Sequence, residues 1–327
     1  MTETTQAIWA VSDGRAGLAN QVLGLAEAVA RLSPRPIEIK TVERRTLYNM
    51  FGARGAKGVL RGAGEALSSP WPRLLIGCGR ASISLSIAVK RASEGATFTV
   101  QTQDPRTAAG NFDLVVPPMH DNLTGENVFP IVGSPNRLTP EQLKDAAQKF
   151  AARYATLPRP RVAALIGGDA KRLKLNDRAM RTIIGAFQKL EAEGAGLMIT
   201  TSRRTGEENT EKLRTALAGK RADIWDGTGE NPYLGMLALA DYILVTEDSV
   251  NMATDAAATG KPVFTLKLSG HNPKYTHFHE ELQKRGIERE FGGTLENFAY
   301  APLNETERAA REICRRAKLP LLSSRQA

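Results

Sequence analysis

Short apolar runs alternate with longer segments of helical period along the whole chain. In the first half, the apolar runs predict strands at residues 7–11, 37–41, 74–76, 97–101, 114–116 and 128–131. Helices are predicted between them, for example at residues 21–32 and 83–92. In the first of these helices, Val22, Leu25 and Val29 recur on one face. Strands that alternate with helices in this way indicate a parallel sheet.

The alternation stops at residues 157–161, Leu-Pro-Arg-Pro-Arg, and then restarts. The prolines make this stretch stiff and helix-breaking, as expected of a linker. Beyond it, strands are predicted at residues 162–166, 197–201, 222–225, 242–246 and 262–266, and helices at residues 177–193, 208–217, 233–240, 250–259 and 305–318.

We therefore predict an α/β protein of two Rossmann-like, doubly wound domains that face each other across a cleft, the glycosyltransferase B type. A length of 327 residues suits two domains of roughly 100–200 residues each. The first domain is expected at residues 1–157 and the second at residues 158–302. In this fold type a terminal helix often crosses back, so residues 303–327 are expected to join the first domain.

The composition is that of a soluble globular protein, with 42% hydrophobic and 24% charged residues. The two cysteines, Cys78 and Cys314, are far apart and match no metal-ligand spacing, which favours a reducing, cytoplasmic location. The first residues carry no apolar run of signal-peptide length. No run of ~18 apolar residues occurs, so no membrane span is expected.

The chain is basic, with 44 Lys and Arg residues against 35 acidic ones. This excess favours an anionic partner, and the absence of interleaved basic and aromatic residues argues against nucleic acid. Residues 44–64 contain five cations and no acid, with apolar residues between them. Such a segment can lie peripherally on the anionic inner membrane and receive a lipid-linked acceptor. A solvated loop is the alternative.

The richest candidate site follows the strand at residues 242–246. Glu247 and Asp248 lead into Ser249, a good N-cap for the next helix. The first N–H groups of that helix, with its dipole, make a phosphate site, and Asn251 in the first turn can donate to a phosphate oxygen. Asp255, further along, can accept from the ribose hydroxyls. The alternative is a plain helix with a solvated Asp255.

Two further strand ends carry groups that suit a diphosphate. Gly167 and Gly168 permit a sharp turn and close backbone approach to a ligand, and Lys171 and Arg172 follow them. After the strand at residues 197–201 come Arg203 and Arg204, one of which is expected to contact the diphosphate. We prefer Arg203 slightly.

A Gly-rich loop at residues 225–231 is a candidate for holding the nucleobase, with Asn231 as a helix cap and Pro232 in the first turn. His277 and His279 diverge on a predicted helix, which argues against a metal site.

The catalytic candidates lie in the first domain, where Asp13 and Arg15 follow the first strand in a Gly-rich turn. Asp13 is the first candidate for a general base, and Arg15 for steadying phosphate charge. An Asx-type turn is the alternative role of Asp13. Asp104 and His120 are alternative bases at later strand ends.

Several of these segments together resemble the mitochondrial-fission "elongated mitochondria" (ELM-type) family. They are residues 245–252 (VTEDSVNM) through 260–263 (GKPV), 12–17 (SDGRAG), 278–282 (FHEEL), 285–287 (RGI) and 300–306 (YAPLNET). The second half is also similar to the donor domain of lipid-linked and Kdo-type glycosyltransferases, where the residue matching Asp255 is usually Glu. The resemblance implies the fold, and the plant member's recruitment of a dynamin-related protein implies an adaptor role.

Two functions follow from these patterns. The first is a metal-independent glycosyltransferase that uses a nucleotide-sugar, a UDP- or other NDP-sugar, as substrate and needs no further cofactor. Its acceptor would be lipid-linked or an envelope glycan. The alternative is a non-catalytic adaptor or binding protein on the same scaffold. A dinucleotide-dependent epimerase is disfavoured because the first strand lacks a complete Gly-x-Gly-x-x-Gly turn.

Overall fold

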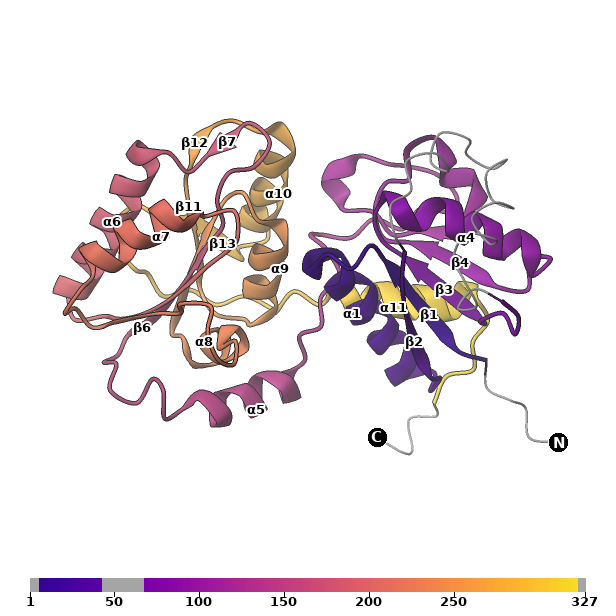
Figure 1. Cartoon of the computed structure of the whole chain (residues 1–327), viewed down its shortest axis with the longest axis horizontal. Helices are drawn as coiled ribbons and strands as arrows, with labels where there is room; N and C mark the ends of the chain where they lie inside the picture. The colour runs from indigo at the N-terminus through magenta and orange to yellow at the C-terminus, as the bar shows by residue number, and fades with distance from the viewer. Residues whose placement is uncertain (1–5, 43–67, 323–327) are drawn as a thin grey trace. The chain divides into compact units, whose positions relative to one another are not determined.

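The computed structural model describes residues 6–42 and 68–322. The chain forms two compact units, Met1–Arg137 with Asn304–Ala327, and Leu138–Leu303. Both are α/β units built on a parallel sheet (Figure 1). The basic segment at residues 44–64 lies outside the described residues, so its contact with a membrane stays a prediction.

The first unit is a parallel sheet of five strands in the order β2-β1-β3-β4-β5. The strands are β1 (Ile8–Ser12), β2 (Ile37–Thr41), β3 (Leu74–Gly77), β4 (Phe98–Gln101) and β5 (Leu114–Val115). Every residue of β1 and β3 is buried, because helices cover both faces.

Successive side chains of a strand point to opposite faces of this sheet, and each face is covered by its own layer of helices. Ile8 and Ala10 pack with α1 (Ala16–Leu32) and α11 (Glu305–Arg316), whereas Trp9 and Val11 pack with α4 (Arg80–Ala92). Helix α11, yellow in Figure 1, lies along α1. The predicted return of the terminal helix to the first unit is confirmed.

The predicted strand at residues 128–131 is wrong. Only isolated bridges form there, Val115 with Val128 and Pro118 with Ile131. Pro117, Pro118 and Pro130 have no N–H groups, so a continuous ladder cannot form. Two 3₁₀ helices complete this region, η3 (Arg106–Asn111) and η4 (Met119–Asp121).

The second unit has a parallel sheet of six strands in the order β13-β11-β10-β6-β8-β9. These are β6 (Arg161–Ile166), β8 (Gly196–Thr201), β9 (Ala222–Ile224), β10 (Tyr242–Thr246), β11 (Val263–Leu266) and β13 (Glu288–Glu290). The short strands β7 (Leu173–Lys174) and β12 (Ser269–Gly270) pair antiparallel beside it.

The helices of this unit are α5 (Pro140–Phe150), α6 (Asp177–Ala192), α7 (Glu207–Ala216), α8 (Tyr233–Leu239), α9 (Val250–Ala258) and α10 (Pro273–Lys284). Met180, Ile183 and Phe187 of α6 pack with Leu213 of α7 on one face of the sheet. Buried alanines of α9 permit its close packing on β10 and β11.

The division of the chain falls before α5, earlier than the predicted boundary at residue 158. Helix α5 packs on α8, and a Cβ on Gly235 would lie 2.6 Å from the Phe150 ring. This close approach ties α5 to the second unit, although the Pro-rich stretch at residues 157–161 follows it.

Each sheet reverses its strand order at one point, between β1 and β3 in the first unit and between β6 and β10 in the second. In open α/β sheets, ligands bind outside the carboxyl ends of the strands at such switch points. The loops that follow β6 and β10 contain Gly167 and Asp248, and those that follow β1 and β3 contain Asp13 and Cys78.

Candidate functional site

The Gly167–Gly168 turn after β6 is held against the loop that follows β10. The Gly167 N–H donates to Thr246 Oγ1 at 2.7 Å, and the Gly168 N–H donates to Asp248 Oδ2 at 3.0 Å. A Cβ on Gly167 would lie 2.3 Å from the Asp248 carboxylate oxygens, and one on Gly168 would lie 1.9 Å from the Arg204 carbonyl oxygen. The two glycines therefore allow the ends of β6, β8 and β10 to pack closely together.

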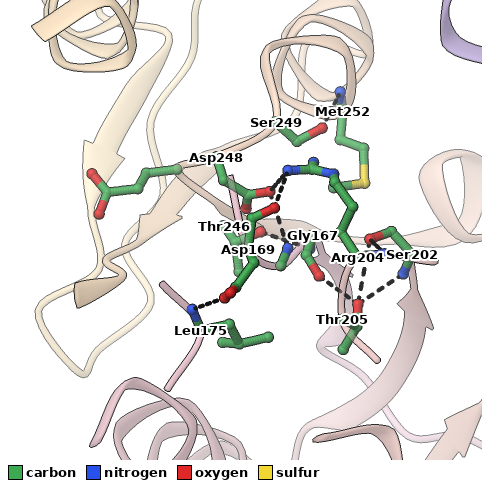
Figure 2. A network of polar contacts seen from close by, with 12 residues as sticks. Gly167, Asp169, Leu175, Ser202, Arg204, Thr205, Thr246, Asp248, Ser249 and Met252 are labelled. Carbon is green, nitrogen blue, oxygen red and sulfur yellow. Dashed lines mark hydrogen bonds and ion pairs between the residues drawn. The ribbon is translucent and has the colours of Figure 1, made fainter. Parts of the chain in front are cut away.

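Arg204 completes this cluster (Figure 2). Its Nη1 lies 2.6 Å from Asp248 Oδ2. The Asp248 side chain is fully buried, whereas that of Arg204 is 42% exposed. Asp248 Oδ1 is buried and makes no hydrogen bond within the described part of the chain. A buried carboxylate is thus neutralised by a partly exposed cation, whose Nη1 also donates to the Asp169 carbonyl oxygen at 3.4 Å.

The arginine that contacts the turn is Arg204 and not the slightly preferred Arg203, and a diphosphate contact of either arginine stays a prediction. Arg203 is exposed and makes no hydrogen bond or ion pair among residues 6–42 and 68–322. Thr205 explains the difference, because its hydroxyl bonds the carbonyl oxygens of Ile166 and Gly167. This anchor turns the Arg204 backbone toward β6.

Helix α9 begins beside Asp248, as the sequence predicts. Ser249 is its N-cap, and the Ser249 hydroxyl accepts from the Met252 N–H at 3.4 Å. The first turn contains no acid, so the positive end of the helix dipole is not neutralised from within the helix. Asn251 lies in this turn and is half-buried.

Asp255 is half-buried and accepts a hydrogen bond from the Tyr233 hydroxyl at 2.9 Å. Burial, and then the Asp255 charge, raise the Tyr233 pKa, so its hydroxyl stays protonated and donates. Tyr233 was not among the predicted site residues, although its place after Pro232, in the first turn of α8, was a signal. Asn231 accepts from the Tyr233 N–H at 3.0 Å, and the N-cap is Pro232.

Glu247 points to the opposite flank of the same loop. Its Oε1 accepts from the Leu268 N–H at 2.7 Å, and Lys267 Nζ lies 3.4 Å from its Oε2. Its carbonyl oxygen accepts from His279 Nε2 at 2.9 Å. Glu247 was predicted beside the phosphate, but its carboxylate is engaged in joining β10 to the segment after β11.

Lys171 and Arg172 lie exposed in the short loop between β6 and β7. The Lys171 carbonyl accepts from Asn272 Nδ2 at 2.7 Å, and Arg172 has a positive φ of 65°. Their side chains make no contact within the described chain. Asp169, in the same loop, pairs with Lys174 at 2.7 Å, and that hydrogen bond lowers the Asp169 pKa.

The loop at residues 225–231 is held by hydrogen bonds of its own and by an ion pair between Glu230 and Lys149 of α5. Trp225 Nε1 donates to the Thr228 carbonyl at 2.9 Å, and Asp226 accepts from the Thr228 N–H at 2.9 Å. Its residues from Asp226 to Asn231 are exposed. The role of this loop in binding a nucleobase stays a prediction.

In the first unit, Asp13 and Arg15 are brought together. Arg15 Nη2 lies 2.7 Å from Asp13 Oδ2, and Arg15 Nε donates to the same oxygen at 2.9 Å. The hydrogen bond from Arg15 holds the Asp13 pKa below its ordinary value. Asp13 also accepts from the Arg15 N–H at 3.2 Å, the Asx-type turn considered as its alternative role.

Buried neutral groups lie behind this pair at the ends of β3 and β4. The Cys78 thiol donates to Gln21 Oε1 at 3.2 Å, and Gln103 Nε2 donates to the same oxygen at 3.4 Å. Burial raises the pKa of Cys78 to about 12, so this thiol stays protonated. Both cysteines are free and buried.

The two alternative bases lie on other loops of this unit. Asp104 Oδ1 accepts from the Arg106 N–H at 2.6 Å, ahead of η3. His120 is half-buried in η4. No contact joins either of them to Asp13 in the described structure.

Within the described ranges, no group of three or more His, Cys, Asp and Glu side chains is placed to hold a metal ion. Among residues 6–42 and 68–322, no helix combines the length and apolar character needed to cross a membrane.

Sequence comparison decides the family. The profile of the family described as Mitochondrial fission ELM1 matches residues 16–317, most of the chain. The chain belongs to this family. The mitochondrial fission protein ELM1 of Arabidopsis thaliana is 28% identical over 286 residues, which cover 79% of this chain and 67% of the plant protein. An uncharacterised protein of Rickettsia prowazekii is 25% identical over 352 residues, which cover 94% of this chain and 97% of that protein.

Solved structures similar to this ELM1 family member include a UDP-GlcNAc 2-epimerase and a protein in complex with UDP. The UDP-GlcNAc 2-epimerase of Methanocaldococcus jannaschii aligns with a TM-score of 0.60 and 12% identity, over 94% of this chain and 99% of its own. Os79 of O. sativa, in complex with UDP, aligns with a TM-score of 0.51 and 15% identity, over 96% and 94%. At these identities the likeness shows the fold alone, and it confirms the glycosyltransferase B type.

Proposed function

We propose that this ELM1 family member binds a nucleotide-sugar through its second unit and transfers the sugar to an acceptor. One observation supports this above all. At the switch point of that sheet, the turn after β6, Arg204 after β8 and the start of α9 after β10 meet around Asp248. Together they place a helix dipole and an accessible guanidinium at one strand-end site, the requirements of a diphosphate.

In the proposed complex, the diphosphate lies at the first turn of α9, with Asn251 and the exposed nitrogens of Arg204 as donors. The ribose hydroxyls donate to Asp255, whose carboxylate is oriented by Tyr233. We assign the nucleobase to the loop at residues 225–231. The structural neighbours support the ligand class, because several of those structures contain UDP or UDP-GlcNAc.

The proposed transfer breaks the bond between the anomeric carbon and the diphosphate, and an acceptor oxygen forms the new bond to that carbon. The acceptor proton passes to a carboxylate of the first unit, with Asp13 the first candidate. The departing diphosphate gains negative charge, which the α9 dipole and Arg204 stabilise without a metal. We propose a lipid-linked or envelope glycan as acceptor, and peripheral contact with an anionic membrane.

Tyr233→Phe is expected to weaken UDP binding roughly tenfold. The substitution removes a donor to a carboxylate, and hydrogen bonds to charged groups contribute about 1.5–3 kcal/mol, where 1.4 kcal/mol is tenfold. Isothermal titration of the full chain with UDP measures this. Tyr242→Phe is the control, because the Tyr242 hydroxyl makes no hydrogen bond within the described chain. Equal affinity of Tyr233→Phe and the wild type, or no binding of UDP by the wild type, contradicts the proposed site.

A second candidate function is binding without transfer, the adaptor alternative. The Asp13–Arg15 contact favours it, because a carboxylate whose pKa is lowered is a weaker base. Release of UDP from UDP-sugars, measured with a membrane extract as acceptor source, separates the two.

For the transferase we expect Asp13→Asn to slow UDP release by about 10²–10⁴, the usual contribution of a general base, with an unchanged Kd for UDP. A wild type that binds UDP but releases none from any UDP-sugar is an adaptor.

A further inference from the structure

The loop from Thr246 to Ser249 is held from two sides. Thr246 and Asp248 accept from the N–H groups of Gly167 and Gly168 on one side. Glu247 lies between them and is bound on the other side through its carboxylate and its carbonyl oxygen. The position of the α9 start therefore depends on the partners of Glu247 as well as on the Gly167–Gly168 turn.

His279 of α10 is the partner of the Glu247 carbonyl. A carbonyl oxygen only accepts, so His279 Nε2 carries the proton of that 2.9 Å bond. His279 Nδ1 faces both oxygens of Glu288 on β13, each at 2.9 Å. The side chains are 2% and 0% exposed, so water cannot mediate these contacts. A second proton must lie between Nδ1 and Glu288, because a bare nitrogen lone pair would otherwise face a carboxylate.

We propose that His279 is a positioning residue for the diphosphate site, and that the proton it shares with Glu288 sets the Glu247 carbonyl and hence the start of α9. This inference rests on the proposed function, which it extends to a pH dependence of affinity. His279 touches no ligand in this scheme and acts through the Glu247–Asp248–Ser249 backbone.

The sign of the pH dependence follows from the charges around the ring. Burial alone would lower the His279 pKa, but the hydrogen bond and charge of Glu288, with the Glu247 carbonyl and carboxylate, outweigh it and raise the pKa above its ordinary value. Lys267, which pairs with the Glu247 carboxylate, is the cation on that side. The ordering of the loop is therefore complete below the ordinary histidine pKa of about 6.5 and is lost as pH rises through the raised value.

A purely structural role, holding α10 to β13, is the competing explanation. Two near-isosteric variants separate the roles, because the amide nitrogen of Gln reaches the place of Nε2 and that of Asn the place of Nδ1. His279→Gln keeps the donor to the Glu247 carbonyl and loses the contact with Glu288. His279→Asn keeps the contact with Glu288 and loses the donor to Glu247.

The first measurement is titration of the full chain with UDP between about pH 6 and pH 9, where the histidine proton is lost. We expect wild-type affinity to fall as pH rises. His279→Gln should bind with an affinity that does not change with pH. His279→Asn should bind about tenfold more weakly at low pH, the effect of losing one charge-assisted hydrogen bond. Equal affinity of His279→Asn and His279→Gln at every pH would overturn the positioning role.

The second measurement needs no ligand. Hydrogen exchange of the Met252 and Gly168 amides, which bond Ser249 and Asp248, reports the order of the loop in the free protein. At one pH, His279→Asn should exchange faster than His279→Gln at both amides. If this difference appears but the wild type does not bind UDP, the proposed function fails and the positioning role stands. If the two variants exchange alike, the positioning role fails whatever UDP does.

Discussion

Gly168→Ala is expected to destabilise the second unit by about 3 kcal/mol or more and to abolish UDP binding. The new Cβ would lie 1.9 Å from the Arg204 carbonyl oxygen and 2.1 Å from its carbon. Overpacking costs about 1–3 kcal/mol where side chains can adjust, but here the obstacle is backbone. Displacing the turn also breaks the bond from the Gly168 N–H to Asp248, which leaves a buried carboxylate with one donor fewer.

Urea denaturation followed by tryptophan fluorescence measures this loss. Trp225 lies in the second unit, whereas Trp9 and Trp71 lie in the first, so a Trp9→Phe/Trp71→Phe background reports the second unit alone. Gly185→Ala is the control. Gly185 lies inside α6 with nothing within 4 Å of an added Cβ, so this change should be neutral or stabilising by about 0.5–1 kcal/mol. Equal midpoints for the two variants would show that the turn relaxes without cost.

Arg204→Ala is expected to cost about 3 kcal/mol of stability at neutral pH, the lower end of the range for breaking a buried ion pair. The loss comes from Asp248, whose fully buried side chain keeps its charge and loses its cation. The lower end applies because Arg204 is 42% exposed, so part of the pair is screened by water. Affinity for UDP should fall as well, since the proposed phosphate donor is removed.

The charge explanation is tested by a second substitution. Asp248→Asn in the Arg204→Ala background removes the buried charge and should restore most of the lost stability, in a double-mutant cycle of urea midpoints. Arg203→Ala, which removes an exposed side chain without contacts, should stay within about 0.5 kcal/mol of the wild type. If Arg203→Ala and Arg204→Ala cost the same, the Asp248–Arg204 pair is not what stabilises the turn.

Helices and strands that are defined by a pattern within one short stretch of sequence were predictable. The strands β1, β6 and β10 were located as short apolar runs, because strands covered on both faces of a parallel sheet are apolar throughout. The buried face of α1 was located from its helical period. Ser249 was predicted as the cap of α9, since its partner is only three residues away. The strand predicted at residues 128–131 does not form. That prediction rested on the apolar character of the segment alone, and the neighbouring prolines prevent a continuous ladder.

The partners of the site residues lie far apart in the chain, and periodicity carries no information about them. Gly168 meets Asp248, Arg204 meets the same carboxylate, and His279 reaches Glu247 because β6, β8, β10 and β11 are neighbours in the sheet order. Local pattern determined which strands and helices form and which ends carry polar groups. Tertiary packing decided that Arg204 rather than Arg203 reaches the turn, and that Tyr233 binds Asp255. Such pairs depend on strand order and register, which are set by burial of the whole sheet and not by any one segment.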